Sequence, residues 1–374
     1  MINNINIAWD VFLKKKSDVF PKIKNNIILT KKIQINVADQ IKPVHILITG
    51  QTGSGKTLTA VLILCQSKYA MFLDPKGQVH DTLEELGEEK NWVFYKITDS
   101  PRVRTYVPFK LNVREFNTSI LNVLAFKKSG GINLRVRNAL YQFFKMKDNN
   151  PTKTYANFKK MCNTSSLKLV FEELAPILSE TDEGISILEL MKQRSVLDLA
   201  GFDSDSKALP CIVRQILNYR QENWSITRDK FFFGCDEAQD YARGNSAMGY
   251  AMGMVFSQGR SFNMVGVICA NVIGRLNPNI KNNAFIMLIF DTSFDKKRYY
   301  DLYNIDLTDE SIEGKMEEIK EENEYGNCVY HNRHTGQSIP IHVDMNYYKW
   351  VRENKDKPIR VRLETLGNNY LKAI

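Results

Sequence analysis

Short runs of apolar residues alternate with segments of helical spacing along much of this chain. These runs are Val44–Thr49, Tyr69–Leu73, Trp92–Ile97, Ser195–Leu199, Lys230–Cys235, Met264–Ala270 and Ala284–Phe290. Runs of this length predict strands that are buried on both faces of a sheet. The helical segments between them include Thr57–Gln66, Leu209–Tyr219 and Ser246–Phe256. This alternation predicts an α/β fold with a mostly parallel sheet that is covered by helices on both faces.

The pattern changes between residues 112 and 193, where helical spacing continues without a strong strand signal. The helices predicted here are Ser119–Phe126, Ile132–Met146, Leu167–Leu178 and Ser186–Met191. We interpret the block 112–193 as an all-helical insertion in the α/β core. The core then comprises residues 41–111 and 194–345.

The two ends of the chain carry smaller predicted elements. Residues 1–40 are rich in lysine and contain two β-like stretches, Asn26–Thr30 and Lys32–Val37, which predict a strand pair. Toward the other end, Asp309–Glu324 predicts a charged, exposed helix and Gly326–Val343 predicts a hairpin. Residues 346–374 form a C-terminal tail.

Composition and charge are typical of a globular protein with a basic excess. Charged residues make up 25% and hydrophobic residues 43% of the 374 residues, and the formal net charge is +9. A basic excess favours a polyanionic partner such as DNA, although an AT-rich genome that encodes many lysines gives the same balance. The sequence contains no run of about 18 apolar residues, and its polar N-terminus lacks the pattern of a signal peptide. We therefore expect a cytoplasmic protein without a transmembrane segment.

The cysteines are scattered along the chain and include no CxxC pair. They are Cys65, Cys162, Cys211, Cys235, Cys269 and Cys328. Several lie inside apolar runs, which favours buried, reduced thiols over a zinc site or a set of disulfides.

A glycine-rich loop separates the first core strand from the first core helix. The loop Gly50-Gln51-Thr52-Gly53-Ser54-Gly55-Lys56-Thr57 satisfies the pattern GxxxxGK[ST]. Glycines let the backbone N–H groups face the phosphates of a nucleotide, and the following helix adds the positive end of its dipole. Lys56 is expected to reach the β- and γ-phosphates of ATP, and the Thr57 hydroxyl is expected to ligate Mg²⁺.

Two acids follow the apolar strand predicted at Phe231–Cys235. At the carboxyl edge of a parallel sheet, Asp236 and Glu237 are expected to lie beside the glycine-rich loop. Asp236 would hold Mg²⁺ through water, and Glu237 would act as the general base on the attacking water. The alternative is a pair of surface acids after a core strand.

Three further polar positions lie at strand ends. Asp74-Pro75-Lys76-Gly77 ends the second core strand and is either a plain turn or a charged loop near the active site. Arg260 comes just before the strand Met264–Ala270 and could project across a subunit interface, whereas Asn271 at its end could sense the γ-phosphate or orient water. The other arginine candidates are Arg214, Arg243, Arg275 and Arg298.

Taken in order, these motifs resemble the FtsK–HerA superfamily of DNA-pumping P-loop ATPases. Besides the glycine-rich loop, the matching segments are Asp74–Gly77, Ser195–Phe202, Asp236–Gln239 and Gln258–Phe262 with the strand after it. The resemblance covers roughly residues 25–345. The Asp-Pro-Lys-Gly and Gly-Arg-x-Phe segments are more specific than the loop and the acidic pair.

The resemblance implies a RecA-like core and an ATP-driven DNA translocase that acts as a homohexameric ring. Arg260 then matches the arginine that enters the neighbouring subunit's site, and Asn271 matches a polar sensor that is commonly glutamine in the family. Double-stranded DNA would be gripped through its phosphates, without sequence reading. The process would be genome packaging, conjugative transfer or segregation, and a viral protein would be virion-associated.

The resemblance also bears on the helical block and on what the chain lacks. The coupling proteins carry helices in the same place, so residues 112–193 could dock a capsid, membrane-channel, relaxase or nuclease partner. The coupling proteins' transmembrane anchor and HerA's N-terminal barrel have no counterpart here, which suggests a minimal motor.

Two other activities remain open. Asp236–Gln239 with Asp240 also matches motif II of superfamily-one helicases, but no GDxxQ motif follows the next strand and no second RecA-like domain is evident. A protein-handling assembly or secretion ATPase of the Zot-like kind would share the nucleotide motifs and not respond to DNA. A nucleotide switch without enzymatic activity is disfavoured because Glu237 supplies a base.

Overall fold

The computed structural model describes most of the predicted core. The described residues are 26–28, 34–36, 44–96, 118–125, 133–145, 168, 187–202, 208–223, 229–290, 296–322 and 326–343. The predicted helix Leu167–Leu178 lies outside them apart from Lys168, as do Cys162 and the tail 346–374. No helix among the described residues has the length and apolar character needed to cross a bilayer.

A nine-stranded sheet forms the centre of the protein, in the order β11-β10-β9-β3-β8-β7-β4-β6-β5. The seven strands from β9 to β5 are parallel, and β10 and β11 are antiparallel. The parallel strands are β3 His45–Thr49, β4 Tyr69–Asp74, β5 Val93–Lys96, β6 Arg194–Asp198, β7 Phe231–Cys235, β8 Met264–Ala270 and β9 Ala284–Phe290. Each matches a predicted strand to within one residue at either end. A strand buried on both faces is a continuous apolar run, so the ends of the run in the sequence indicate the ends of the strand.

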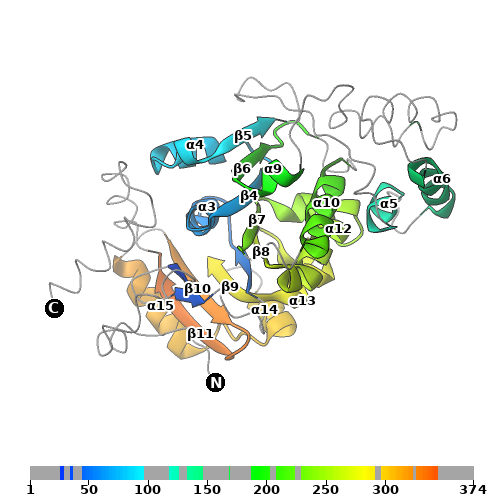
Figure 1. Cartoon of the computed structure of the whole chain (residues 1–374). Helices are drawn as coiled ribbons and strands as arrows, with labels where there is room; N and C mark the ends of the chain where they lie inside the picture. The colour runs from blue at the N-terminus through cyan, green and yellow to red at the C-terminus, as the bar shows by residue number, and fades with distance from the viewer. Residues whose placement is uncertain are drawn as a thin grey trace.

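Helices cover the two faces of this sheet (Figure 1). Helices α3 (Lys56–Cys65) and α4 (Val79–Glu85) pack on one face, where their apolar residues join strand residues such as Phe72 in one core cluster. On the other face lie α9 (Ile187–Met191), α10 (Ala208–Glu222) and α12 (Ala247–Gln258), which join the alternate strand residues in a second cluster. The two clusters correspond to the layers expected of an α/β domain.

The strand order gathers four strand ends at one edge of the sheet. β3, β8, β7 and β4 are consecutive neighbours and run parallel, so their carboxyl ends meet. The residues that follow these ends are the glycine-rich loop, Asn271, the pair Asp236-Glu237 and the Asp74–Gly77 loop. Segments that are more than 200 residues apart in sequence, such as Gly50 and Asn271, therefore form one site, as the rule for parallel sheets predicts.

The far edge of the sheet carries the predicted hairpin. β10 (Asn327–Asn332) pairs with β9 and β11 (Gln337–His342), and helix α15 (Glu310–Glu322) packs beside them (Figure 1). Ile312 and Met316 anchor α15 in the core. The predicted strand pair near the N-terminus is also present, as antiparallel β1 (Asn26–Ile28) and β2 (Gln34–Asn36).

The described part of the block 112–193 is helical, as predicted. It contains α5 (Thr118–Leu124), α6 (Leu134–Lys145) and α9. Arg137 Nε donates to Asn122 Oδ1 over 2.7 Å and ties α6 to α5, while α5 packs on α10 of the core. The domain boundaries at residues 112 and 193 stay predictions.

Several short helices were not predicted from the sequence. They are α4, α11 (Ala238–Tyr241), α13 (Pro278–Asn283) and α14 (Lys296–Tyr303). Each is eight residues or shorter, so few buried positions mark a helical period. The five cysteines in the described part of the chain are buried, and none of them forms a disulfide.

Candidate active site

The glycine-rich loop lies between β3 and α3, where the predicted strand–loop–helix context requires it. At Gly50, φ is +148° and a Cβ would stand 2.3 Å from the Phe290 carbonyl oxygen, so only glycine fits. Gly55 is the N-cap of α3 with φ +96°, and no side chain caps the helix. The first N–H groups of α3 are therefore available to an anion at the helix N-terminus.

Lys56 and Thr57 begin α3 and point into the pocket beyond the loop. Lys56 Nζ donates to the Gln51 carbonyl oxygen over 2.5 Å, and burial lowers the pKa of this lysine. Thr57 Oγ1 donates to Asp236 Oδ2 over 2.6 Å. This contact joins the loop to the acidic pair across 179 residues of sequence.

Asp236 and Glu237 follow β7 as predicted. Asp236 is 3% exposed, and burial raises the pKa of its carboxyl group. Its backbone N–H donates to the Leu73 carbonyl oxygen over 3.2 Å, which fixes the start of the turn. Glu237 has left-handed backbone angles, φ 44° and ψ 39°, which are uncommon for residues other than glycine.

The Glu237 carboxylate receives hydrogen bonds from three side chains of other positions. Oε2 accepts from Asn271 Nδ2 over 3.0 Å and also from Gln239 Nε2, whereas Oε1 is ion-paired with Lys76 Nζ. Burial tends to raise the pKa of Glu237, but the Lys76 and Gln239 hydrogen bonds outweigh it and lower the pKa. Gln239 Oε1 also accepts the Asn271 N–H over 3.0 Å, so these residues form one network.

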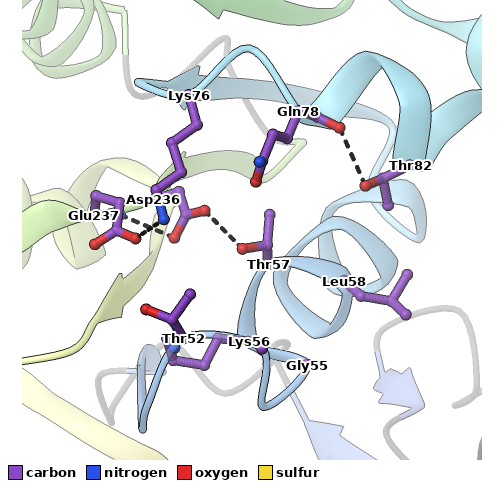
Figure 2. Close-up of a pocket in the computed structure, with 11 residues that line it drawn as sticks. Thr52, Gly55, Lys56, Thr57, Leu58, Lys76, Gln78, Thr82, Asp236 and Glu237 are labelled. Carbon is purple, nitrogen blue, oxygen red and sulfur yellow. Dashed lines mark hydrogen bonds and ion pairs between the residues drawn. The ribbon is translucent and has the colours of Figure 1, made fainter.

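A single pocket joins the loop, the acids and the Asp74–Gly77 segment (Figure 2). It is lined by Thr52, Gly53, Gly55, Lys56, Thr57, Leu58, Lys76, Gln78, Thr82, Asp236 and Glu237. Of the predicted site residues, most of the loop and both acids line this pocket. Asn271 does not line it, but its side chain donates a hydrogen bond to Glu237, which does. Lys76 lies in the Asp-Pro-Lys-Gly segment, for which the sequence left a plain turn and a charged loop near the active site open, whereas Leu58, Gln78 and Thr82 were not predicted.

The donor set in this pocket fits Mg²⁺. The Thr57 hydroxyl and the Asp236 carboxylate are hard oxygen donors in direct contact. Among the described residues no group of three or more His, Cys, Asp or Glu side chains forms a metal cage. That arrangement suits Mg²⁺, which is usually bound by one or two protein oxygens together with substrate phosphates and water.

Arg260 does not belong to this pocket. It lies in a 3-10 turn, η4 (Gly259–Phe262), is exposed, and precedes β8, at the opposite end of that strand from Asn271. Its charge helps to lower the pKa of the buried His45, which starts β3 at the same edge of the sheet.

The other candidate arginines lie in different environments. Arg214 is 1% exposed on α10, so its guanidinium cannot project from the surface. Arg243 and Arg275 are exposed on two loops that pair with each other, and Arg298 is half-buried on α14.

No family model and no curated protein matches this sequence. Among solved structures, this chain is similar to VirB4 of Thermoanaerobacter pseudethanolicus, with a TM-score of 0.50 and 14% identity over 80% of this chain and 89% of that chain. It is also similar to the plasmid coupling protein TrwB in complex with ADP and Mg²⁺, with a TM-score of 0.53 and 12% identity over 91% and 87%. These likenesses confirm that the chain has the RecA-like P-loop NTPase fold that its resemblance to the FtsK–HerA superfamily implies.

Proposed function

We propose that this protein hydrolyses ATP and uses the energy to move DNA, as a ring of six subunits. ATP hydrolysis is supported by one observation: Thr57, Asp236 and Glu237 line the same pocket beside the P-loop, and Thr57 is hydrogen-bonded to Asp236. A phosphate-binding loop without a base would suit a switch, whereas a carboxylate held at the pocket wall suits hydrolysis. The TrwB structure with ADP and Mg²⁺ supports the same ligands for this fold.

The loop, Lys56, Thr57, the two acids and Asn271 each have a role in this reaction. The loop N–H groups and Lys56 bind the phosphates, and Thr57 and Asp236 hold Mg²⁺, which would neutralise charge on the phosphate oxygens. Glu237 accepts a proton from the attacking water. Asn271 holds the Glu237 carboxylate in place from the neighbouring strand end, over 3.0 Å.

The position of Arg260 supports a ring. An exposed arginine at the edge away from its own pocket can stabilise transition-state charge only in another subunit. A contact in which one subunit's arginine enters the next subunit's pocket is head-to-tail, and such contacts form a ring when the rotation between subunits closes. Six is the number that the family resemblance implies.

Two paired loops beside the catalytic network supply a basic surface for DNA. The loop after α11 and the loop after β8 are joined by an Arg243–Leu276 bridge, and Gly244 N–H donates to the Arg275 carbonyl oxygen over 3.1 Å. The Arg243 side chain is 53% exposed, and its described acidic neighbour is Asp240 at 4.0 Å. Exposed arginines suit contacts with the phosphates of DNA.

These loops are also close to the chemistry in sequence and structure. One follows Glu237 by a single short helix, and the other follows Asn271 directly. Changes in the Glu237–Gln239–Asn271 network on hydrolysis would therefore reach both arginine loops through a few residues. This is the coupling that a translocase requires.

A helicase of superfamily one is less favoured than a DNA-pumping motor, because no GDxxQ motif follows strand β8 in the sequence. A protein-handling ATPase would have the same pocket, so only an experiment can distinguish it from a DNA motor.

The test is ATP turnover of the purified protein with and without double-stranded DNA, with mass measured by light scattering. We expect DNA to stimulate turnover and the mass to be near six subunits. Glu237→Gln should lower turnover by about 100-fold or more, and Arg260→Ala by about 1,000-fold. Arg135→Ala, at an exposed site on α6, is the charge-matched control and should behave as wild type.

Other outcomes would separate the alternatives. Turnover that ignores DNA, with Arg260→Ala fully active in an assembled protein, would favour the protein-handling ATPase. If the wild type binds nucleotide but does not hydrolyse it, the proposed ATPase activity is wrong.

A further inference from the structure

Lys76 enters the pocket from the side opposite the P-loop (Figure 2). Its loop is fixed by Asp74, whose carboxylate accepts the backbone N–H groups of Lys76 over 3.2 Å, Gly77 over 3.0 Å and Val79 over 2.8 Å. A carboxylate that holds several N–H groups of its own turn makes the turn rigid. The loop therefore directs the Lys76 side chain across the pocket rather than leaving it to sample solvent.

The Lys76 ammonium is paired with the proposed catalytic base. Nζ contacts Glu237 Oε1, and the two side chains are 37% and 11% exposed. The hydrogen bond to Glu237 raises the pKa of Lys76, so this ammonium stays charged. The two groups keep each other charged.

This pairing makes Glu237 a poor base in the present arrangement. Its carboxylate oxygens accept from Lys76, Gln239 and Asn271 at once, and the ion pair with Lys76 opposes the transfer of a proton to Glu237. Gln239 and Asn271 are neutral and can orient the carboxylate without opposing proton transfer. Lys76 carries a full positive charge, so it is the partner that has to leave before the base is effective.

The pocket itself indicates what would draw Lys76 away. Lys56 and Lys76 are the lysines that line it, and Figure 2 shows them on opposite sides with Thr57 and Asp236 between them. A triphosphate held by the P-loop adds more negative charge to this space than one carboxylate. A diphosphate bound to the same loop lacks the terminal group and leaves Glu237 as the nearest anion to Lys76.

We propose that Lys76 binds the γ-phosphate of ATP and, in exchange, releases Glu237 to act as the base. The inference rests on the proposed ATPase function. In the reaction, the water oxygen forms a bond to the γ-phosphorus, and the bond from that phosphorus to the bridging oxygen breaks with its electron pair leaving on ADP. The water proton passes to Glu237. Without a γ-phosphate, Lys76 pairs with Glu237 again, and Glu237 is not available as a base.

The first test compares binding of a slowly hydrolysed triphosphate, ATPγS, with binding of ADP, both with Mg²⁺. Lys76→Met removes the charge and keeps most of the side-chain stem. It should weaken ATPγS binding about tenfold or more, because a charge-assisted contact is lost, and change ADP binding less than about twofold. Lys68→Met is the matched control, since Lys68 precedes the same strand β4, is ion-paired with Asp229 and lies outside the pocket. It should alter neither affinity.

The second test is a double-mutant cycle on the pair. Glu237→Gln removes the competitor for Lys76, so it should tighten ATPγS binding about fivefold relative to ADP binding. In the Lys76→Met background the same substitution should give no gain. A purely structural role of Lys76 would not produce this difference between nucleotides.

The outcomes are distinguishable from failure of the proposed function. If the wild type binds and hydrolyses ATP but Lys76→Met weakens ATPγS and ADP equally, or neither, then Lys76 does not bind the γ-phosphate. If the wild type does not hydrolyse ATP, the proposed function fails first. A gain from Glu237→Gln that persists in Lys76→Met protein would also overturn the exchange.

Discussion

Arg260 and Asn271 lie at opposite ends of strand β8. The strand has seven residues, and at about 3.3 Å per residue it separates them by about 23 Å. Asn271 is bonded to Glu237, whereas Arg260 is exposed at the other edge of the sheet. No arginine side chain spans that distance, so one chain cannot bring both groups to one nucleotide.

The separation predicts that two inactive variants restore each other. Glu237→Gln and Arg260→Ala subunits should each be inactive alone. In mixed rings, an Arg260→Ala subunit keeps its base and can receive the arginine of a Glu237→Gln neighbour. About a quarter of the sites in a random equal mixture should then be active, as measured by ATP turnover after subunit exchange.

The mixing experiment needs evidence that mixed rings form, which differently tagged subunits provide by co-purification. Mixing either variant with itself is the control and should give no recovery. Mixed rings without recovered turnover would mean that Arg260 does not act across an interface.

The contact between Asn271 and Glu237 predicts a shift in the pH dependence of turnover. Asn271→Asp places a second carboxylate 3 Å from the Glu237 carboxylate, and like charges raise the pKa of each other. The base is then protonated at higher pH than in the wild type. Turnover should therefore fall off at a higher pH as the solution is made more acidic, in a profile of kcat against pH.

Asn271→Gln is the matched control for that profile. It keeps the amide donor and matches the residue that is commonest in the resembling family, so its acidic limb should stay near that of the wild type. Identical acidic limbs for Asn271→Asp and the wild type would show that Glu237 is not the titrating base.

The strands could be predicted from the sequence because their signal is local. Met264–Ala270 and Ala284–Phe290 were predicted with the bounds that the structure has, since every residue in each run is apolar and nearly all are buried. Helix α4 was missed because only Val79 and Leu83 are buried in it, and no side chain caps its start. Two buried positions do not establish a helical period.

The contacts within the site could not be predicted, because they depend on strand order. The sequence indicates that Asp74–Gly77 and Glu237 each follow a strand. It does not indicate that β4 and β7 are neighbours, and that neighbourhood brings Lys76 to Glu237 across 161 residues. The left-handed turn at Glu237 has no sequence signal either, because such angles are usual for glycine.

His45 predicts an acid-sensitive term in stability. It is fully buried, its Nδ1 accepts the Gly266 N–H over 2.9 Å, and burial lowers its pKa to about 3, helped by the charges of Arg260 and Lys230. The folded pKa is below the ordinary value near 6.5, so protonation favours unfolding. The contribution of neutral His45 to the free energy of unfolding is fully present above pH 6.5 and is lost as the pH falls toward 3. At pH 5 the loss is about 2 kcal/mol.

His45→Asn isolates this term because asparagine offers an acceptor oxygen near the same place and does not titrate. Between pH 7 and pH 5, the free energy of unfolding from urea titrations should fall about 2 kcal/mol more for the wild type than for the variant. Other titrating groups, such as His331, are common to both proteins. Parallel pH dependence in the two proteins would contradict the burial of a neutral His45.

The paired arginine loops predict how DNA binding responds to salt. If Arg243 and Arg275 each neutralise one phosphate, each substitution to alanine should weaken binding of double-stranded DNA equally for unrelated sequences. The slope of log affinity against log salt should become shallower by about 1 per substitution, because one fewer counterion is released. Fluorescence anisotropy with two DNA sequences at several salt concentrations measures both effects.

The salt slope discriminates between a phosphate contact and damage to the loop. Arg243→Lys keeps the charge and should keep the slope, whereas loss of loop structure would weaken binding in both Arg243 variants. Arg135→Ala removes a charge of equal sign from exposed α6 and should leave the slope unchanged. Nucleotide affinity should stay at the wild-type value in all of them, since none of these arginines lines the pocket. If the slope and the DNA affinity are unchanged in both alanine variants, Arg243 and Arg275 do not contact the DNA phosphates.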